Sequence, residues 1–378
     1  MKCIDELSAG ELKGRRVLVR TGLDLSLTDS GEVADFFRVE KALPTLEYLK
    51  NAGAHTIILN HIGRDPQNSN EIVARSLQRY LPAVFIPDLV GSVAQHAVQS
   101  MKDGEIAVLE NLRRDPRETS NDESLAREIT ALGDMYVDDA FSAVHRAHAS
   151  IVGIPKFLPH YAGFLLRDEI AQLDHARHPE SPSFAILGGA KFETKAPLIK
   201  SLLEKYDHLF ITGALTNDVF KVRGLPVGVS LISKELPSAD ILSNPRFLAP
   251  VDVTVERSDK QARVKKPEAV EAEDKIVDIG PDTVAMLAPH ITQAKFILWN
   301  GPTGIFEEGY TSWTHGIAEL VAKAVAGGAQ AVIGGGDTIA AIQESGIAED
   351  SLGFLSTGGG AMLEYLLKGT LPGIEALK

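Results

Sequence analysis

A single local pattern recurs along the whole chain: a short run rich in β-branched residues, a turn, and then a stretch with helical spacing of apolar side chains. From Val39 onward, apolar residues recur at i, i+3, i+4 and i+7, and Gly53 stands where a helix C-cap belongs. Strands that alternate with helices in this way favour parallel sheets covered by helices on both faces. The pattern therefore predicts an α/β fold.

The number of predicted strands indicates more than one sheet. One sheet of all these strands would be unusually large, so we predict two α/β domains, with the helical segment 163–177 joining them. The charged stretch 256–275 has no clear period and is interpreted as a hairpin or a surface excursion. The expected strands are 16–21, 55–60, 83–86, 106–110 and 135–137 in the first half, and 184–187, 209–212, 251–255, 296–299, 331–333 and 353–355 in the second.

The charge balance limits the partners that the protein can have. The chain carries 38 basic and 51 acidic residues, a formal net charge of −13. Such an acidic surface repels nucleic acids and anionic membranes, so neither is expected as a partner, and any anion site must be a local basic pocket. Cys3 is the single cysteine, which excludes a disulfide framework and a cysteine-based zinc site. Without a leader-like start or a bilayer-length apolar stretch, a cytoplasmic protein is expected.

Basic and imidazole side chains follow the predicted strands of the first half. Because the carboxyl ends of parallel strands meet at one edge of a sheet, these side chains are expected to form an anion pocket suited to phosphate or carboxylate. The alternative is that these are surface arginines paired with the many acidic residues. Surface pairing is the better explanation for any single arginine, but it does not explain why so many of them follow strands. The residues are Arg20, Arg38, His61, Arg64, Arg113, Arg114, His145, Arg146 and His148.

Glycine takes the place of arginine at the strand ends of the second half. Glycine permits close backbone approach, and bare N–H groups at a helix N-terminus bind phosphate. Tight strand-to-helix turns explain one or two such loops, but not a whole series. Neither GxxxxGK[ST] nor GxGxxG occurs, so the common nucleotide fingerprints are absent. The loops begin at Gly188, Gly213, Gly301, Gly334 and Gly358.

Several polar residues in these glycine-rich loops have two interpretations. Lys191 and Lys195 lie four apart, on one face of a helix start. Asp337 either caps its helix or holds Mg²⁺ beside a nucleotide phosphate. Glu307 is either a solvated acid or an acceptor for ribose hydroxyls. Together the two halves favour phosphoryl transfer between an anion and a nucleotide, although a binding module without chemistry stays open.

Longer motifs make the chain resemble the phosphoglycerate kinase family over essentially its full length. Residues 110–113, ENLR, match a segment of that family, and YVDDAFSAVHRAHAS at 136–150 is similar to its YVNDAFGTAHRAHAS block. Residues 187–195 resemble LGGAKVSDK, and residues 299–307 resemble WNGPVGVFE. IGGGDT at 333–338 and STGGG at 356–360 complete the series in the same order.

The resemblance implies a fold of two Rossmann-like, doubly wound parallel-sheet domains joined by a hinge helix. It implies reversible phosphoryl transfer between 1,3-bisphosphoglycerate and MgADP, giving 3-phosphoglycerate and MgATP, as in glycolysis or its reverse. Mg²⁺ and ATP or ADP are the expected cofactors, and a monomer is expected. The implied domains are 1–162 for the substrate, 163–177 as linker helix, 178–360 for the nucleotide, and 361–378 as a segment that packs back on the first domain.

The resemblance also implies roles for individual residues. Arg38 and Lys191, with the backbone N–H groups of Gly358 and Gly359, would stabilise the phosphoryl group in transit. The substrate would lie against Asp24, Arg38, His61, Arg64, Arg113 and Arg146. The nucleotide would be held by Lys195, Gly213, Asn300, Pro302, Glu307, Gly336, Asp337 and Thr338, with Asp337 as the Mg²⁺ ligand.

One departure from the family falls on the substrate side. Where the family has Asp-x-Asn, residues 22–24 are Gly-Leu-Asp, so the aspartate that accepts the substrate hydroxyl is missing. Asp24 adds a second anion that arginine or protonation must offset, or it forms a substitute pair with Ser26 on the same face of the strand. This favours an alternative function, a paralogue that binds nucleotide and an anion but uses another carboxylate or has lost catalysis.

Two further departures lie on the nucleotide side. Thr212-Gly213-Ala214 stands where the family has three glycines facing adenine, and Thr194 replaces an aspartate beside Lys195. These changes narrow the expected base slot and leave the phosphoryl-transfer residues in place. A nicotinamide-dependent dehydrogenase also fits the α/β pattern but lacks the dinucleotide fingerprint.

Overall fold

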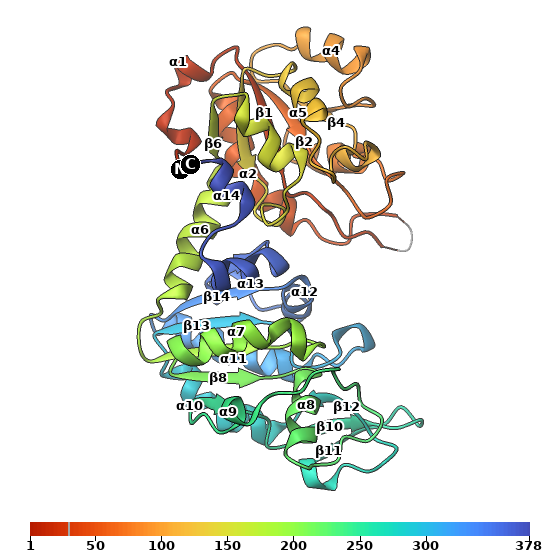
Figure 1. Ribbon diagram of the computed structural model, residues 1–378, viewed down its shortest axis with the longest axis vertical. Coiled ribbons are helices and arrows are strands. Elements are labelled where there is room, and N and C mark those ends of the chain that lie inside the picture. Colours follow the sequence, from red (N-terminus) through yellow and green to blue (C-terminus); the bar gives the residue numbers. More distant parts are fainter. Residues whose placement is uncertain (29–30) are drawn as a thin grey trace. The chain divides into compact units, whose positions relative to one another are not determined.

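The computed structural model describes residues 1–28 and 31–378, and it divides the chain into two compact units (Figure 1). The first unit comprises residues 1–171 together with 370–378, and the second comprises residues 172–369. Helix α6 (Phe164–Arg177) contributes residues to both units, and it agrees closely with the helix predicted at 163–177. None of the helices that the structure describes is both long and apolar enough to cross a bilayer.

The first unit is built on a parallel sheet with the strand order β3-β4-β2-β1-β5-β6. Central strand β1 is apolar on both sides of its pleat, and Val17, Leu18 and Val19 are fully buried, as expected for a strand covered by helices on both faces. Its neighbours are fixed in register by Arg16↔His55 and Val17↔Met135. The strands are β1 (Arg16–Thr21), β2 (His55–Leu59), β3 (Ala83–Ile86), β4 (Ile106–Leu109), β5 (Met135–Asp139) and β6 (His160–Ala162).

Helices follow the strands of this sheet, as the alternating pattern predicts. Helix α2 continues through Pro44, and helix α5 begins where the Asp122 carboxylate accepts a hydrogen bond from the Ser124 N–H at 2.7 Å. The helices are α1 (Ala9–Leu12), α2 (Phe37–Asn51), α3 (Glu71–Leu77), α4 (Ser92–Gln99), α5 (Glu123–Thr130) and α14 (Pro372–Ala376), with short turns η1 (Ile4–Glu6), η2 (Leu112–Arg114), η3 (Ala149–Gly153) and η4 (Ile154–Lys156).

The second unit contains another parallel sheet, with the order β15-β14-β13-β7-β8-β9. The two parallel sheets confirm the predicted α/β fold. Strands β6 and β9 were not predicted because each has only two or three residues, too few for a period to be recognised. The strands are β7 (Ser183–Leu187), β8 (His208–Ile211), β9 (Phe247–Leu248), β13 (Phe296–Asn300), β14 (Gln330–Gly334) and β15 (Phe354–Ser356).

A separate antiparallel sheet, β11-β10-β12, corrects one prediction. The run at 251–255 was expected in the parallel sheet, but β10 (Val253–Glu256) pairs with β11 (Ala262–Lys265) and β12 (Lys275–Ile279) instead. The β10–β11 pair is the hairpin that the charged stretch suggested. Side-chain alternation identifies a strand but not the partner it pairs with, so the sequence pattern left the sheet of β10 undecided.

The helices of the second unit include two that begin at glycines. Helix α12 starts at Gly336 and helix α13 at Gly359, each directly after a strand of the sheet. The helices are α7 (Phe192–Lys205), α8 (Leu215–Val222), α9 (Ala239–Leu242), α10 (Pro281–Thr292), α11 (Ser312–Ala326), α12 (Gly336–Glu344) and α13 (Gly359–Lys368), with short turns η5 (Pro267–Ala269), η6 (Phe306–Glu308) and η7 (Glu349–Leu352).

The C-terminal segment returns to the first unit later than the sequence suggested. Helix α13 packs on α7 inside the second unit, so the returning segment is 370–378 rather than 361–378. Figure 1 shows the blue helix α14 among elements of the first unit, where the Gly373 N–H donates to the Val144 carbonyl at 2.9 Å. A Cβ on Gly373 would lie 2.8 Å from a methyl of Ile151, so only glycine permits this approach.

Asp139, at the end of β5, should make the first unit less stable as the pH rises. Its Oδ1 accepts the Leu166 N–H at 3.1 Å, and burial raises its pKa to about 7. Between pH 4 and 7 an unfolded aspartate loses its proton while the folded one keeps it. The unfolded state then binds fewer protons, so stability falls over this range.

The matching experiment compares the wild type with Asp139→Asn by urea unfolding at pH 5 and pH 8. The free energy of unfolding should fall more steeply with pH in the wild type, by about 1.4 kcal/mol for each pH unit that separates the two pKa values. Asp65→Asn, on an exposed loop, is the control. Parallel pH dependences in the wild type and Asp139→Asn would contradict this account.

Candidate active site

Arg20 lies inside the first unit rather than in an anion pocket. Its side chain is fully buried on β1, where Nε donates to Ser150 Oγ at 3.0 Å and Nη2 lies 2.8 Å from His61 Nδ1. The expectation that Arg20 faces a ligand with the other strand-end arginines is therefore wrong. Strand β1 lies between β2 and β5, and the guanidinium contacts residues that follow those two strands, His61 and Ser150.

His61, directly after β2, is a neutral imidazole held in one orientation. Burial, followed by the charges of Arg20 and Arg113, lowers the pKa of His61 well below its usual range. Because Arg20 can only donate, His61 Nδ1 accepts and the ring proton is assigned to Nε2. That Nε2 lies 3.7 Å from Oδ2 of Asp24. His61 thus presents an N–H toward the loop after β1.

Asp24 is held by the protein and is not an isolated second anion. Its Oδ1 accepts the Gly63 N–H at 2.7 Å, and its Oδ2 faces His61. Asp24 also acts electrostatically on Arg146, where its charge favours the protonated guanidinium. The repulsion that the sequence suggested is therefore offset by a backbone donor, an imidazole and an arginine.

Three of the predicted arginines do converge. An open cavity of about 520 Å³ is lined by Arg64, Arg113 and Arg146, together with His148. Among the described residues that line it, no carboxylate is present. Burial, followed by the charge of Arg113, lowers the pKa of Arg146, and burial with Arg20 and Arg146 lowers the pKa of His148 to about 4. Guanidinium groups that line a cavity without a carboxylate in its described lining form a site for an anion.

The cavity is built by loops that donate to one another. The Arg113 guanidinium donates to the Gly63 carbonyl, which ties the loop after β4 to the loop after β2. Buried Glu118 accepts the Ser150 hydroxyl at 2.6 Å and approaches His148 Nδ1 at 3.7 Å. These contacts fix the orientation of the cavity walls before any ligand arrives.

Arg38 and Gly22 meet at the end of β1. Arg38 lies in the first turn of α2, and its Nη1 donates to the Gly22 carbonyl at 3.2 Å. A Cβ built on Gly22 would lie 2.8 Å from Ser142 Oγ, so Ser142 takes up the space that a side chain at position 22 needs. Ser142 was not predicted as a site residue. Its signal was the serine at 142 in a block where the similar family motif has glycine.

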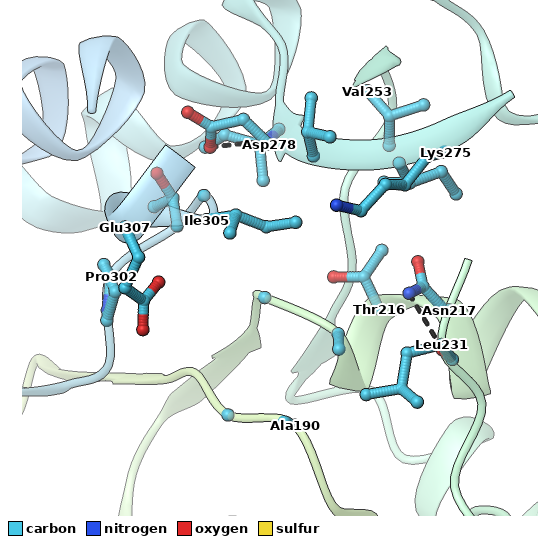
Figure 2. Close-up of a pocket in the computed structure, with 18 of the residues that line it drawn as sticks. Ala190, Thr216, Asn217, Leu231, Val253, Lys275, Asp278, Pro302, Ile305 and Glu307 are labelled. Atoms are coloured by element: carbon cyan, nitrogen blue, oxygen red, sulfur yellow. Dashed lines mark hydrogen bonds between the residues drawn. The ribbon is translucent and has the colours of Figure 1, made fainter. Parts of the chain in front are cut away.

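The second unit holds a pocket of about 390 Å³ that is mostly apolar (Figure 2). Of the predicted nucleotide residues, Gly213, Pro302, Glu307 and Asp337 line it. The others, Lys195, Asn300, Gly336 and Thr338, do not. The remaining lining residues are Gly189, Ala190, Ala214, Thr216, Asn217, Leu231, Val253, Lys275, Ile276, Val277, Asp278, Ile279, Thr303, Gly304 and Ile305.

Some of the glycines bring loops together rather than exposing backbone to a ligand. Gly213 has φ +65°, and a Cβ there would lie 3.1 Å from the Gly189 backbone nitrogen. A Cβ on Gly188 would lie 2.9 Å from the Pro302 carbonyl oxygen. At Gly336 and Gly360, in contrast, a Cβ would meet nothing within 4 Å. Gly336, at the start of α12, and Gly360, in the first turn of α13, therefore leave open space for phosphate.

Lys191 and Lys195 occupy different surroundings although they lie one turn apart. Lys191 is the exposed N-cap residue of α7, whereas Lys195 is half-buried and burial lowers its pKa. Lys195 and Gly360 line one small cavity between α7 and α13. The Gly358 N–H donates to Ser356 Oγ at 3.2 Å.

Asn300 and Thr338 support the loop after β13 from inside. Thr338 is fully buried, and its Oγ1 accepts the Gly301 N–H at 2.8 Å. Asn300 is also buried, with Nδ2 4.0 Å from Met362 Sδ. The hydroxyl of Thr338 therefore positions the loop that carries Pro302, and its part in nucleotide binding stays a prediction.

Asp337 and Glu307 are two exposed carboxylates that line the same pocket. Partial desolvation by the surrounding loops, followed by the charge of Glu307, raises the pKa of Asp337. Oxygen donors and excess negative charge fit Mg²⁺, which binds through one or two carboxylates, waters and substrate phosphates. The described residues contain no group of three or more His, Cys, Asp or Glu side chains placed to hold a metal by themselves.

Five polar residues of the pocket were not predicted: Thr216, Asn217, Lys275, Asp278 and Thr303. Asp278 is the next-to-last residue of β12, and burial raises its pKa to about 7. Thr216 and Asn217 lie in the first turn of α8, after Gly213. Asp278 was missed because its strand was not predicted, whereas the polar pair directly after a glycine loop was a signal that could have been used.

Comparisons with known proteins agree with this fold. A family model described as Phosphoglycerate kinase matches residues 4–369. The phosphoglycerate kinase of Chloroflexus aggregans is 38% identical over 386 residues, covering 97% of this chain and 96% of the relative. That of Rubrobacter xylanophilus is 42% identical over 383 residues, again covering 97% and 96%.

Solved structures agree as well. The crystal structure of phosphoglycerate kinase from Pyrococcus horikoshii superposes with a TM-score of 0.88 at 28% identity, covering 100% of this chain and 98% of the other. The structure of the Coxiella burnetii enzyme gives a TM-score of 0.80 at 32% identity, with 99% and 98% covered.

The fold and these matches define a phosphotransferase whose acceptor is a carboxyl group. The chain belongs to the phosphoglycerate kinase family. Its function is the phosphoglycerate kinase reaction, a nucleotide-dependent step of glycolysis.

Proposed function

We propose that the first unit binds 3-phosphoglycerate through the cavity lined by Arg64, Arg113 and Arg146. The observation that carries this proposal is the convergence of three guanidinium groups on a cavity whose described lining has no carboxylate. A ligand with a phosphate and a carboxylate supplies the missing negative charge, and both groups match the fork of an arginine. His61 and Asp24 lie next to this cavity and orient the ligand through the N–H of His61 and the loop after β1.

The nucleotide is proposed to bind in the second unit. Its base enters the apolar pocket, with Gly213 and Pro302 on the walls and Glu307 near the ribose. Its phosphates lie against Lys195 and the glycine starts of α12 and α13, where helix N-termini attract anions. Gly336 and Gly359 contribute backbone N–H groups there, and Asn300 supports the loop.

Phosphoryl transfer depends mainly on neutralising the charge of the transferred group and does not need covalent catalysis by the protein. In the proposed direction of ATP synthesis, a terminal oxygen of ADP attacks the acyl phosphate, the bond to phosphorus from the carboxyl oxygen breaks, and 3-phosphoglycerate leaves as a carboxylate. Arg38 and Lys191 stabilise the negative charge on the phosphoryl group in transit, together with Gly359 and, after release from Ser356, Gly358. When bound, Mg²⁺ would neutralise nucleotide phosphate charge beside Asp337.

The first test is steady-state phosphorylation of 3-phosphoglycerate by MgATP with the purified chain. We expect turnover that saturates with both substrates. Absence of turnover in a folded chain that binds nucleotide would instead support the alternative raised by residues 22–24, a kinase-like protein for a different carboxylate.

Asp337→Asn should raise the Mg²⁺ concentration needed for half-maximal rate by about tenfold, because one anionic oxygen ligand is lost. The measurement is a titration of Mg²⁺ at fixed ADP, with nucleotide binding in the absence of metal as a second readout. Asp350→Asn, an exposed acid of the same unit, is the control. An unchanged Mg²⁺ requirement in Asp337→Asn would remove Asp337 from the metal site.

The proposal includes a monomer that works in the cytoplasm. Its support is that each cavity is lined by residues of one unit of a single chain, so a second copy is not needed to complete either one. Sedimentation analysis of the purified chain tests the monomer.

A further inference from the structure

Two buried side-chain oxygens on α8 have no hydrogen-bond partner among the residues that the structure describes. Thr216 is 2% exposed and Asn217 is 3% exposed, and both line the apolar pocket of the second unit. Within the part of the chain that the structure describes, neither Thr216 Oγ1 nor Asn217 Oδ1 makes a hydrogen bond. A buried polar atom without a partner is costly, so a pair of them in one pocket calls for a ligand.

The Asn217 amide can present only its oxygen. Its Nδ2 donates to the Leu231 carbonyl at 3.0 Å, and a carbonyl accepts hydrogen bonds but cannot donate them. The opposite assignment of the amide would place two acceptors against each other. Asn217 Oδ1 is therefore a fixed acceptor, whereas the Thr216 hydroxyl is free to donate or accept.

The rest of the pocket indicates what kind of group brings the missing donor. Figure 2 shows Thr216 and Asn217 together on one side of the space, with Lys275 opposite. Lys275 is already occupied, since its ammonium group lies 2.7 Å and 2.9 Å from the two oxygens of Glu308. Most of the remaining lining is apolar, and its other polar members are Asp278, Thr303, Glu307 and Asp337. Leu231 lines the pocket and is 60% exposed, so its side chain offers a surface on which a flat apolar ligand can pack.

We propose that Thr216 and Asn217 recognise the hydrogen-bonding edge of the nucleobase, with Asn217 Oδ1 accepting from the exocyclic amino group of adenine and the Thr216 hydroxyl donating to the neighbouring ring nitrogen. The inference rests on the proposed nucleotide site and adds base recognition to it. Adenine offers a donor and an acceptor side by side, which is the complement of this pair.

The experiment compares two nucleotides on the full-length chain by calorimetry: ADP and the 5′-diphosphate of purine riboside, which lacks the 6-amino group but keeps the ring nitrogen. The wild type should bind ADP about tenfold more tightly, the effect of one hydrogen bond to an otherwise unpaired buried group. Asn217→Leu, which removes the acceptor at similar size, should weaken ADP binding and bring the ratio of the two dissociation constants close to one.

Thr216→Val gives a different pattern, and this separates the two roles. Both ligands retain the ring nitrogen, so both should bind less tightly by a similar factor and their ratio should stay near ten. Thr292→Val is the matched control, because Thr292 is an exposed threonine on α10 whose hydroxyl donates to the Ala288 carbonyl at 2.7 Å. It should change neither constant.

The outcomes separate this inference from the proposed nucleotide site. Equal binding of the two nucleotides by the wild type, or a preference that survives Asn217→Leu, overturns base recognition and leaves the nucleotide site standing. Failure of the wild type to bind either nucleotide overturns both proposals. If Asn217→Leu does not fold, two other results still test the inference. The wild type must bind ADP more tightly than the purine riboside diphosphate, and Thr216→Val must bind both nucleotides less tightly by a similar factor. Absence of either result overturns the inference.

Discussion

Arg38→Ala is expected to lower kcat by about 10²–10³-fold, the usual effect of removing one group that stabilises charge in a transition state. Arg38 is placed for this role by the first turn of α2 and by its hydrogen bond to the Gly22 carbonyl at 3.2 Å. That bond holds the guanidinium at the loop that directly follows β1. Because the interaction develops with the moving charge, kcat should fall far more than nucleotide affinity.

Two companion variants make the Arg38 result specific. Arg38→Lys keeps the charge but loses the planar fork, so its kcat should lie between those of the wild type and Arg38→Ala. Arg75→Ala removes an exposed arginine of the same unit that pairs with Glu71 within one helix, and it should leave kcat unchanged. A kcat that stays at the wild-type value in Arg38→Ala would show that the phosphoryl group does not pass Arg38.

Gly22→Asp is expected to destabilise the first unit by about 1–3 kcal/mol, the usual penalty for overpacking. The Cβ that it adds would lie 2.8 Å from Ser142 Oγ, and Gly22 is buried, so the new carboxylate cannot turn away into water. Ser142→Gly vacates that space. The double variant should therefore recover most of the lost stability, a coupling that a double-mutant cycle measures directly.

The same pair of positions tests how the substrate is held. In Gly22→Asp with Ser142→Gly, a carboxylate is restored where the resembling family places its hydroxyl acceptor, so KM for 3-phosphoglycerate should fall below that of Ser142→Gly alone. Urea unfolding of the four chains and their KM values provide the readout. Strict additivity of the stability changes would mean that positions 22 and 142 do not compete for space.

Much of the fold was predictable because it depends on local pattern. Strand β1 was predicted to the residue, since a short β-branched run between turns is a strong strand signal. Strand β10 shows the limit, because its run was recognised but its partners, β11 and β12, were not. Pairing depends on which other segment is close in space, and alternation within one strand carries no information about that.

The candidate site also contains residues whose placement was predicted from the sequence and one whose placement was not. Arg64, Arg113 and Arg146 were expected together because each follows a strand of one parallel sheet, and they line one cavity. Arg20 followed the same rule and nevertheless turns inward to His61 and Ser150. The position on a strand determines where the side chain starts. A long side chain such as that of arginine can then point into the protein or toward the cavity, and the residues around it determine which direction it takes.

The sequence by itself determined the alternation of strands and helices, and it placed arginines at the strand ends of one half and glycines at those of the other. These features depend on residues close together in the chain. Only the tertiary structure decided that Ser142 fills the space beside Gly22, and that Asn217 donates to Leu231 and keeps its oxygen unpaired. Such relations join residues from different loops, so they depend on packing in three dimensions, which local pattern does not specify.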